Sequence, residues 1–170
     1  MDDNPLDYTS WKKLSFNNVM PFGMFYYDDS LYFYSKNNIY DSDYNLIYNN
    51  VDITIKQVKN INSQVYISYK NSIDIKDYLG VYSNSEIIKI NLPDKIDDIG
   101  DFIGINDGLW ISGKNYSLFS SENKEFYSPV NNINISPEKI FSLDKDIYAT
   151  EANHISINIK NEGWDNLSFD

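Results

Sequence analysis

The chain has 170 residues, no cysteine and no arginine, and its 14 lysines stand against 25 acidic residues for a net charge of −11. Without cysteine there is no disulfide, thiolate nucleophile or cysteine-ligated zinc, and a strongly negative surface without arginine argues against nucleic acid and anionic membranes as partners. Nine Phe, three Trp and fifteen Tyr exclude a disordered chain, and the scarcity of alanine argues against a helical one.

The N-terminal residues 1–9 carry neither a basic region nor an apolar run, and we expect a leader followed by a single domain over residues 10–170. No stretch approaches the roughly 20 apolar residues that span a bilayer. The lack of a signal peptide and of cysteine predicts a cytoplasmic protein. Abundant Lys, Asn, Ile and Tyr, whose codons are AT-rich, indicate a low-GC bacterium, its phage or a similarly biased organism, and a phage-encoded chain would fit the virion as well.

Four segments of the chain share one pattern, and such internal repeats decide the fold class. In each, an anchoring aliphatic residue is followed directly by an aromatic one, with Asp or Asn three residues before the anchor and Asn six residues after it. The anchors are Leu31, Val65, Leu109 and Ile147, and the aromatic residues are Tyr32, Tyr66, Trp110 and Tyr148. Successive anchors lie 34, 44 and 38 residues apart.

Each unit is expected to hold four short strands separated by turns. Asp and Asn before the anchor favour a turn, because their side chains bond their own backbone and tolerate left-handed geometry, and residues 106–108 (Asn-Asp-Gly) are the clearest hairpin signal. Third strands are predicted at Asn38, Ser72–Ile75, Tyr116 and His154, and fourth strands around Tyr48, Tyr82, Phe126 and Trp164.

Four short strands recurring about every 40 residues are typical of one propeller blade, and the chain resembles the β-propeller class over about residues 10 to 170. The resemblance implies an all-β fold of four repeats with about four antiparallel strands each, as a closed four-bladed ring or an open arc. It carries over no functional residues, because the Gly-His and Trp-Asp pair of WD repeats and the double glycine of kelch repeats are missing. A β-sandwich with fortuitous repetition is the alternative fold.

The two ends of the chain share a further motif. Residues 11–17 (Trp-Lys-Lys-Leu-Ser-Phe-Asn) match residues 164–170 (Trp-Asp-Asn-Leu-Ser-Phe-Asp), and both predict the outer strand of a blade. Counting both gives one strand more than a closed four-bladed ring needs, so one copy is expected to cap the array or to pair with another chain. An unpaired edge strand is a template for association, which makes a homo-oligomer joined through edge strands the expectation in the second case.

Catalytic and metal motifs are scarce. His154 is the only histidine, and we interpret it as a strand residue because no Gly-x-Ser-x-Gly elbow accompanies it. Asp41 and Asp43 alternate as in a calcium loop, but Leu46 stands where such a loop requires glycine. We therefore predict no enzyme activity, no cofactor and no metal.

The candidate partner-binding residues are acidic or aromatic: Asp94, Asp97, Asp98, Asp101, Tyr26 and Tyr34. The four aspartates crowd one segment of the longest repeat, which we interpret as an inserted loop, and loops on a rigid scaffold often carry function. The two tyrosines belong to a Tyr-rich run, and tyrosine is favoured at interfaces. A cationic protein is the partner that this charge suggests.

These observations predict a non-enzymatic, acidic protein-binding module, such as an inhibitor or immunity-type protein that covers a basic toxin or nuclease. Two alternatives stay open. One is an assembly component, such as a part of a phage particle, joined through edge strands. The other is a glycan-binding propeller with one site in each repeat.

Overall fold

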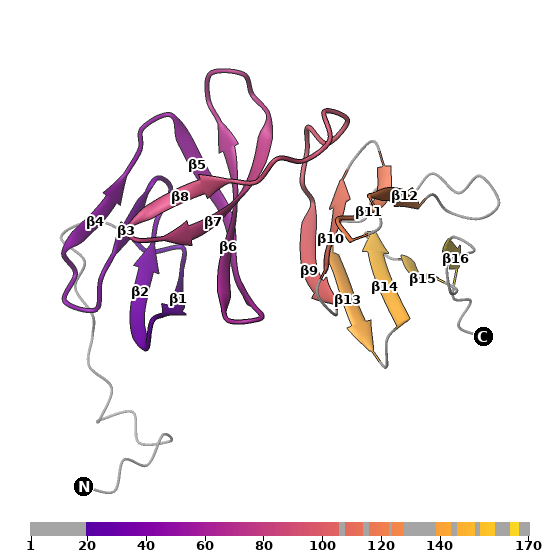
Figure 1. The fold of residues 1–170 in the computed structure, drawn as a ribbon, viewed down its shortest axis with the longest axis horizontal. Helices are drawn as coiled ribbons and strands as arrows, with labels where there is room; N and C mark the ends of the chain where they lie inside the picture. The colour runs from indigo at the N-terminus through magenta and orange to yellow at the C-terminus, as the bar shows by residue number, and fades with distance from the viewer. Residues whose placement is uncertain are drawn as a thin grey trace, which may run out of the picture.

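The structure is a computed structural model, and it describes residues 20–105, 108–113, 116–122, 124–127, 139–143, 146–151, 154–158 and 164–166. Within these ranges the chain is all-β, without a helix, and its strands form four antiparallel sheets, as predicted (Figure 1). The leader of residues 1–9, the motif of residues 11–17 and the side chain of His154 lie outside the described residues, so the predictions for them stay predictions.

Each sheet contains four strands that are consecutive in the chain. The first sheet contains β1 (Gly23–Tyr27), β2 (Ser30–Tyr34), β3 (Asn38–Tyr40) and β4 (Leu46–Asn49). The second sheet contains β5 (Ile53–Ile61), β6 (Gln64–Asn71), β7 (Asp77–Ser83) and β8 (Glu86–Lys89). The third sheet contains β9 (Asp101–Ile105), β10 (Gly108–Gly113), β11 (Tyr116–Ser120) and β12 (Glu125–Tyr127). The fourth sheet contains β13 (Lys139–Leu143), β14 (Asp146–Glu151), β15 (His154–Asn158) and β16 (Trp164–Asn166).

The predicted turn chemistry is present at the described hairpins. Asp28 and Asp29 between β1 and β2 have φ angles of 49° and 55°, and Asn62 and Ser63 between β5 and β6 have 49° and 62°. Two successive residues with positive φ form the tight turn whose twist matches that of the flanking strands. The anchors Leu31, Val65, Leu109 and Ile147 all lie in the second strand of their sheets.

In the second sheet the predicted third and fourth strands are wrong. Residues 72–76 form a turn, and the third strand begins only at Asp77, so that Tyr82 belongs to the third strand rather than the fourth. The alternating Ile73 and Ile75 suggested a strand, but Ile73 N donates to Asn71 Oδ1 at 2.8 Å and Ile75 N donates to Asn71 O at 3.0 Å. These local bonds close the backbone into a turn instead.

The four sheets stack in chain order through their first strands, with β1 beside β5, β5 beside β9 and β9 beside β13. The first and fourth sheets lie at opposite ends of the longest axis of the molecule (Figure 1). A hydrophobic cluster fills each of the three junctions. The first junction holds Phe25, Ile39, Val65, Ile67 and Tyr82, the second Leu79, Ile99, Phe102, Leu109 and Ile111, and the third Trp110, Ile140 and Ile147.

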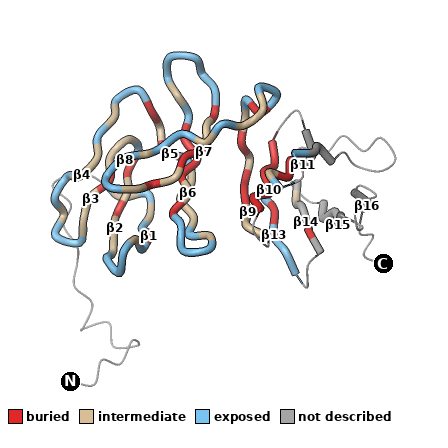
Figure 2. Tube along the Cα trace, in the orientation of Figure 1, coloured by how far each residue is buried: buried red, intermediate tan, exposed pale blue. Residues whose placement is uncertain are grey.

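The two middle sheets are therefore buried on both faces. All six residues of β10 are buried, and Figure 2 shows the buried residues concentrated in the strands of the second and third sheets. Strands covered on both faces carry near-continuous apolar runs rather than alternating ones, which explains sequences such as Gly-Leu-Trp-Ile-Ser-Gly in β10.

Candidate protein-binding surface

The loop of residues 90–100, between β8 and β9, carries three of the four predicted aspartates. Ile96 and Ile99 within it are buried in the junction between the second and third sheets. Its backbone is also fixed, because Ile96 N donates to Pro93 O at 2.9 Å and Gly100 N donates to Ser112 O at 2.8 Å. The loop is thus a packed part of the fold that displays its polar side chains outward.

A buried carboxylate on β7 holds the middle of this loop. Asp77 is 4% exposed, accepts a hydrogen bond from Ile99 N at 2.9 Å and forms an ion pair with Lys56 Nζ. The backbone N–H of Asp77 donates to Asp97 O at 3.0 Å, and Lys56 Nζ also donates to Ile99 O at 2.9 Å. Burying these charges is tolerated because each is paired and hydrogen-bonded.

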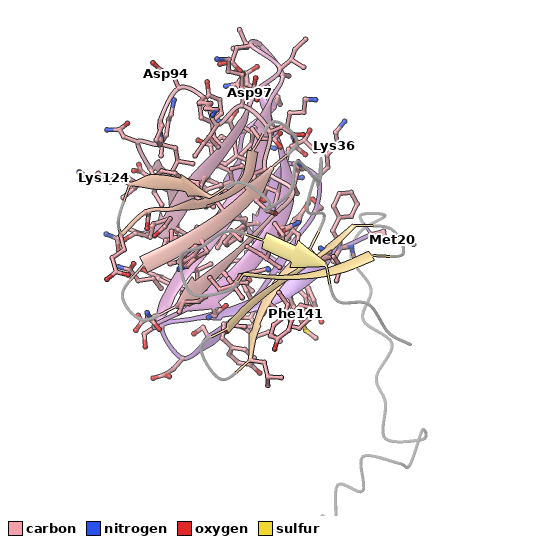
Figure 3. The ribbon with its side chains drawn as sticks, turned by 90° about the vertical axis from the view of Figure 1, so that its right-hand side faces the viewer. Met20, Lys36, Asp94, Asp97, Lys124 and Phe141 are labelled. Atoms are coloured by element: carbon pink, nitrogen blue, oxygen red, sulfur yellow. The ribbon has the colours of Figure 1, made fainter. Side chains whose placement is uncertain are left out.

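The structure separates the four predicted aspartates. Asp94 and Asp97 are exposed and lie at the same end of the molecule (Figure 3). Asp98 is partly exposed, with Oδ1 at 3.7 Å from Lys56 Nζ. Asp101 is 2% exposed and lies at the start of β9. Three of the four can therefore face a partner directly, and Asp101 cannot without a rearrangement of the sheet.

Asp101 instead joins three sheets. Its Oδ1 accepts hydrogen bonds from Lys59 Nζ of the second sheet at 2.5 Å and from Phe102 N of its own strand at 2.9 Å. Its Oδ2 accepts a hydrogen bond from Ile140 N of the fourth sheet at 3.0 Å. Both oxygens are occupied inside the fold, so this carboxylate stabilises the stack.

The environment of Asp98 changes its titration. Burial raises the pKa of Asp98 above its ordinary value, and the neighbouring Asp77 carboxylate raises the pKa further through a hydrogen bond and charge repulsion. Lys56 opposes this shift, but the net direction is upward. Asp98 therefore keeps its proton to a higher pH than an aspartate in water.

We expect Asp98→Asn to raise the unfolding temperature at pH 7. A carboxyl group whose folded pKa is raised favours the folded state at low pH, and that contribution is lost as pH rises through the raised pKa. Asparagine does not ionise, so the variant avoids this loss of stability at pH 7. The difference in unfolding temperature should vanish near pH 4, about where an aspartate titrates in an unfolded chain. Thermal unfolding from pH 4 to pH 7 measures the difference, with the exposed Asp97→Asn as control. A variant less stable than wild type at pH 7 would contradict the expectation.

The two predicted tyrosines do not share a surface. Tyr26 is 63% exposed on β1, on the side of the first sheet that faces away from the second sheet. Tyr34 packs on the opposite side, with its ring centroid 6.5 Å from that of Phe25, and burial raises the pKa of its phenol. Only Tyr26 is therefore placed to contact a partner.

Three exposed aliphatic side chains were not found from the sequence. Val51 lies in the loop before β5, and Ile73 and Ile75 lie in the loop before β7, with exposures of 75%, 77% and 68%. Ser72 connects the two loops, because its N and Oγ donate to Asp52 O at 2.8 Å and 3.0 Å. In the sequence Ile73 and Ile75 alternate as in a strand, so their exposure was not expected, whereas no strand was predicted at Val51, which lies between Asn50 and Asp52.

Ile75 carries backbone strain. Its φ is 62°, a left-handed conformation that is an outlier for a β-branched residue. Such strain costs of order 1–3 kcal/mol and persists only where the surroundings enforce it. Here the bond from Ile75 N to Asn71 O enforces it, and the loop presents both isoleucines to solvent in a fixed arrangement.

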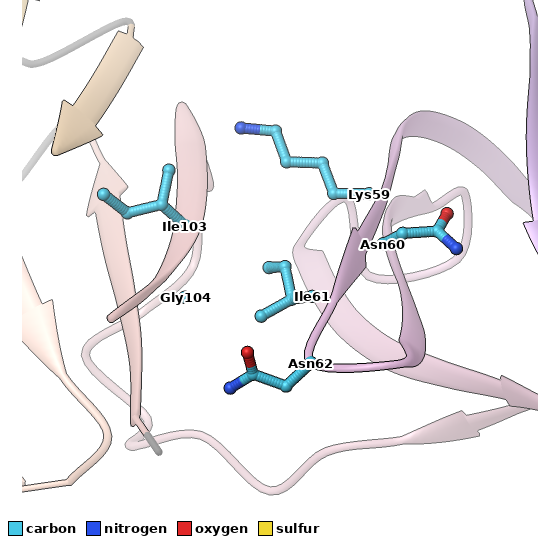
Figure 4. Close-up of a pocket in the computed structure, with 6 residues that line it drawn as sticks. All are labelled: Lys59, Asn60, Ile61, Asn62, Ile103 and Gly104. Carbon is cyan, nitrogen blue, oxygen red and sulfur yellow. The ribbon is translucent and has the colours of Figure 1, made fainter. Parts of the chain in front are cut away.

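Two hollows lie on the described surface. One of about 170 Å³ sits under the loop of residues 90–100, between Lys76, Tyr78, Lys89 and Asp94, and Lys89 Nζ lies 3.8 Å from the Tyr78 ring centroid. The other, of about 480 Å³, opens between the end of β5 and β9 (Figure 4). Its single charged group, Lys59, is already paired with Asp101. The first hollow is smaller than the roughly 300–1,000 Å³ typical of small-molecule sites, and the second has no charged group that is not already paired, so neither has the character of such a site.

Other classes of site find no support in the residues that the structure describes. No three His, Cys, Asp or Glu side chains among them gather to hold a metal ion. None of their segments is a helix with the length and apolarity that a bilayer crossing requires. The sequence matches no protein-family model and no curated protein. The geometry and charge of the surface are therefore the basis for assigning a function.

Proposed function

We propose that the chain is a non-enzymatic module that binds a basic protein through three loops, residues 50–52, 72–76 and 90–100, which we call the loop face. All three loops lie at one end of the stacked sheets, at the top of Figure 1. Ser72 N in the second loop donates to Asp52 O in the first loop. Asp77, which begins the strand after the second loop, donates from its backbone N to Asp97 O in the third loop. The loop face is thus continuous along the second sheet and its junction with the third.

The observation that carries the proposal is the fixed display of exposed aliphatic side chains among carboxylates. Val51, Ile73 and Ile75 are exposed by two thirds or more, and an apolar centre inside a polar rim is the usual anatomy of a protein interface. Because the loops are held by buried residues and backbone bonds, little conformational entropy would be lost on binding, which favours affinity.

The charge of the loop face indicates the kind of partner. Its carboxylates are Asp52, Asp74, Asp94, Asp97 and Asp98, against the two lysines Lys76 and Lys95. An acidic surface steers a cationic partner during encounter and disfavours anionic ones. A small module that covers a basic protein in this way would act as an inhibitor or immunity-type protein. The scaffold that we propose for it is an open arc of four propeller-like blades, supported by the face-to-face stacking of successive sheets.

The test is affinity capture from the native host with three forms of the chain. Wild type should retain a basic protein that is lost when Val51 and Ile73 are replaced together by serine. A control with serine at Leu46 and Ile88, which are exposed to 55% and 56% outside the loop face, should still retain it. Equal retention by all three forms would contradict the proposal. Loss of the captured protein after deglycosylation would favour a glycan-binding module instead.

With the captured partner in hand, Ile73→Asp should weaken binding at least about 30-fold, as expected for a residue worth 2 kcal/mol or more at an interface. Asp94→Asn combined with Asp97→Asn should mainly slow association and reduce its dependence on salt, because exposed charges act on encounter. Surface plasmon resonance at two salt concentrations separates the two effects. An association rate that does not respond to the aspartate substitutions would remove the carboxylates from the binding surface.

A further inference from the structure

The two end sheets each present an apolar face that no other described sheet covers. On the first sheet, Met24 and Tyr26 are 66% and 63% exposed on the side away from the second sheet. On the fourth sheet, Phe141 and Leu143 are 43% and 59% exposed on the side away from the third sheet. The rings of Phe141 and Tyr148 stack there, with centroids 5.2 Å apart and an interplanar angle of 8°.

On the first sheet, the strands that carry this face have the composition of strands buried on both sides. β1 reads Gly-Met-Phe-Tyr-Tyr and β2 reads Ser-Leu-Tyr-Phe-Tyr, without the polar alternation expected of a solvated face. The buried β10 of the third sheet has the same character. The first sheet is thus suited to a covering sheet, and the three internal junctions indicate which sheet fits.

The anchor and the aromatic residue after it recur in every junction. The aromatic residue faces the next sheet in the chain, and the anchor of that next sheet faces back toward it. Tyr32 lies in one cluster with Val65, Tyr66 with Leu109, and Trp110 with Ile147. The same pattern would next pair Tyr148 with Leu31. Within the described stack these two residues face no other sheet, because Tyr148 lies on the outer face of the fourth sheet and Leu31 on the outer face of the first.

A second pair recurs in the first strands. In each junction, the residue six positions before one anchor lies together with the residue seven positions before the next anchor. The three pairs are Phe25 with Val58, Lys59 with Phe102, and Ile103 with Ile140. The contact of Lys59 Nζ with the Phe102 ring is direct, at 5.2 Å to the centroid. The unused pair in this series is Phe141 on the fourth sheet and Met24 on the first. Both are among the exposed residues of the end faces.

We propose that the fourth sheet of one copy packs on the first sheet of a second copy, in the manner of the three internal junctions, so that two copies form a closed ring of eight sheets. The second copy is the occupant because it carries the face that continues both series, whereas the two end sheets of one chain lie at opposite ends of the molecule (Figure 1). A head-to-tail contact closes into a ring or runs on as a filament, and eight blades are within the range of closed propellers. The loop face takes no part in this contact.

A charge exchange at one pair tests the proposal. Wild type should sediment as a dimer. Met24→Lys and Phe141→Asp should each yield monomers, because both junctions of a dimer of either variant contain an unpaired charge in an apolar interface. An equimolar mixture of the two variants should dimerise again, with one unaltered junction and one in which the introduced lysine meets the introduced aspartate. A chain that carries both substitutions should also dimerise. Val51→Asp, on the loop face, should leave the dimer intact.

Several results would overturn the proposal. Wild type that is monomeric at about 100 µM would show that the faces stay uncovered or meet within one chain. Dissociation by only one of the two single variants would show that like faces meet, and a mixture that stays monomeric would show that residues 24 and 141 do not meet across one junction. Species larger than a dimer would rule out the closed ring. Circular dichroism verifies folding, and Met24→Ser with Phe141→Ser replaces the charged variants if either fails to fold.

Discussion

Replacing Asp101 by alanine should lower the free energy of unfolding by about 3–5 kcal/mol, because each buried donor left without its acceptor costs roughly 1–3 kcal/mol and Lys59 also loses its counter-ion. The carboxylate is 2% exposed and receives hydrogen bonds from Lys59 Nζ, Phe102 N and Ile140 N. Its loss leaves a lysine without its counter-ion and two buried backbone N–H groups without their acceptor. Because the three donors come from three sheets, the whole stack should unfold at lower urea concentration, measured by circular dichroism.

Two controls separate this effect from the loss of one negative charge. Asp94→Ala, at an exposed position of the neighbouring loop, should change the unfolding free energy by no more than about 0.5 kcal/mol. Combining Asp101→Ala with Lys59→Met should recover part of the loss, because no unpaired charge then remains at the junction. A double variant less stable than Asp101→Ala alone would show that Lys59 contributes mainly through its other contacts, with Phe102 O and the Phe102 ring.

Asp101 also illustrates why the candidate site was only partly predictable. Asp94, Asp97, Asp98 and Asp101 look alike in the sequence, as one acidic segment. The difference arises from partners far away along the chain, since Lys59 and Ile140 lie 42 and 39 residues from Asp101. Composition predicts an acidic loop, but it does not predict which carboxylate begins a strand and becomes buried by neighbouring sheets.

The fold was easier to predict from the sequence than the candidate site, because the signals for its strands and turns are local. Turn residues such as Asp28 and Asn62 adopt positive φ wherever they occur in a tight hairpin, and they set off the strands between them. The second sheet departs from the prediction at Ser72–Ile75, where the Asn71 side chain and a strained Ile75 produce a turn from a sequence that also suits a strand. The exposed isoleucines of the loop face were missed for this reason.

The order in which the sheets stack could not be derived from the strand pattern alone. A two-residue period predicts that Tyr66 and Val65 face opposite sides of their sheet, but not which sheet covers each side. Once the junctions are known, the recurring aromatic and aliphatic pair accounts for all three of them. The same pair then identifies the outer faces of the first and fourth sheets as halves of a further junction.

The junction between the second and third sheets also depends on a glycine. A Cβ at Gly104 of β9 would lie 2.1 Å from Cγ2 of Ile61 at the end of β5, closer than any real contact. Both residues line the hollow in Figure 4, where the Ile61 side chain points toward β9. The absence of a side chain at Gly104 therefore allows β5 and β9 to approach.

We expect Gly104→Ala to lower the free energy of unfolding by about 1–3 kcal/mol, the usual cost of inserting atoms into a packed interior. Ile61→Ala alone should cost less than the roughly 2–5 kcal/mol of a fully buried isoleucine, because Ile61 is only partly buried. It also removes the methyl group that the new Cβ would strike. The double variant should consequently be more stable than the sum of the two single losses predicts, with a coupling of about 0.5–3 kcal/mol. Urea unfolding of the four proteins measures that coupling. Strictly additive losses would show that β9 shifts away from β5 to accommodate the methyl group, and that the close approach at Gly104 is not required for the junction.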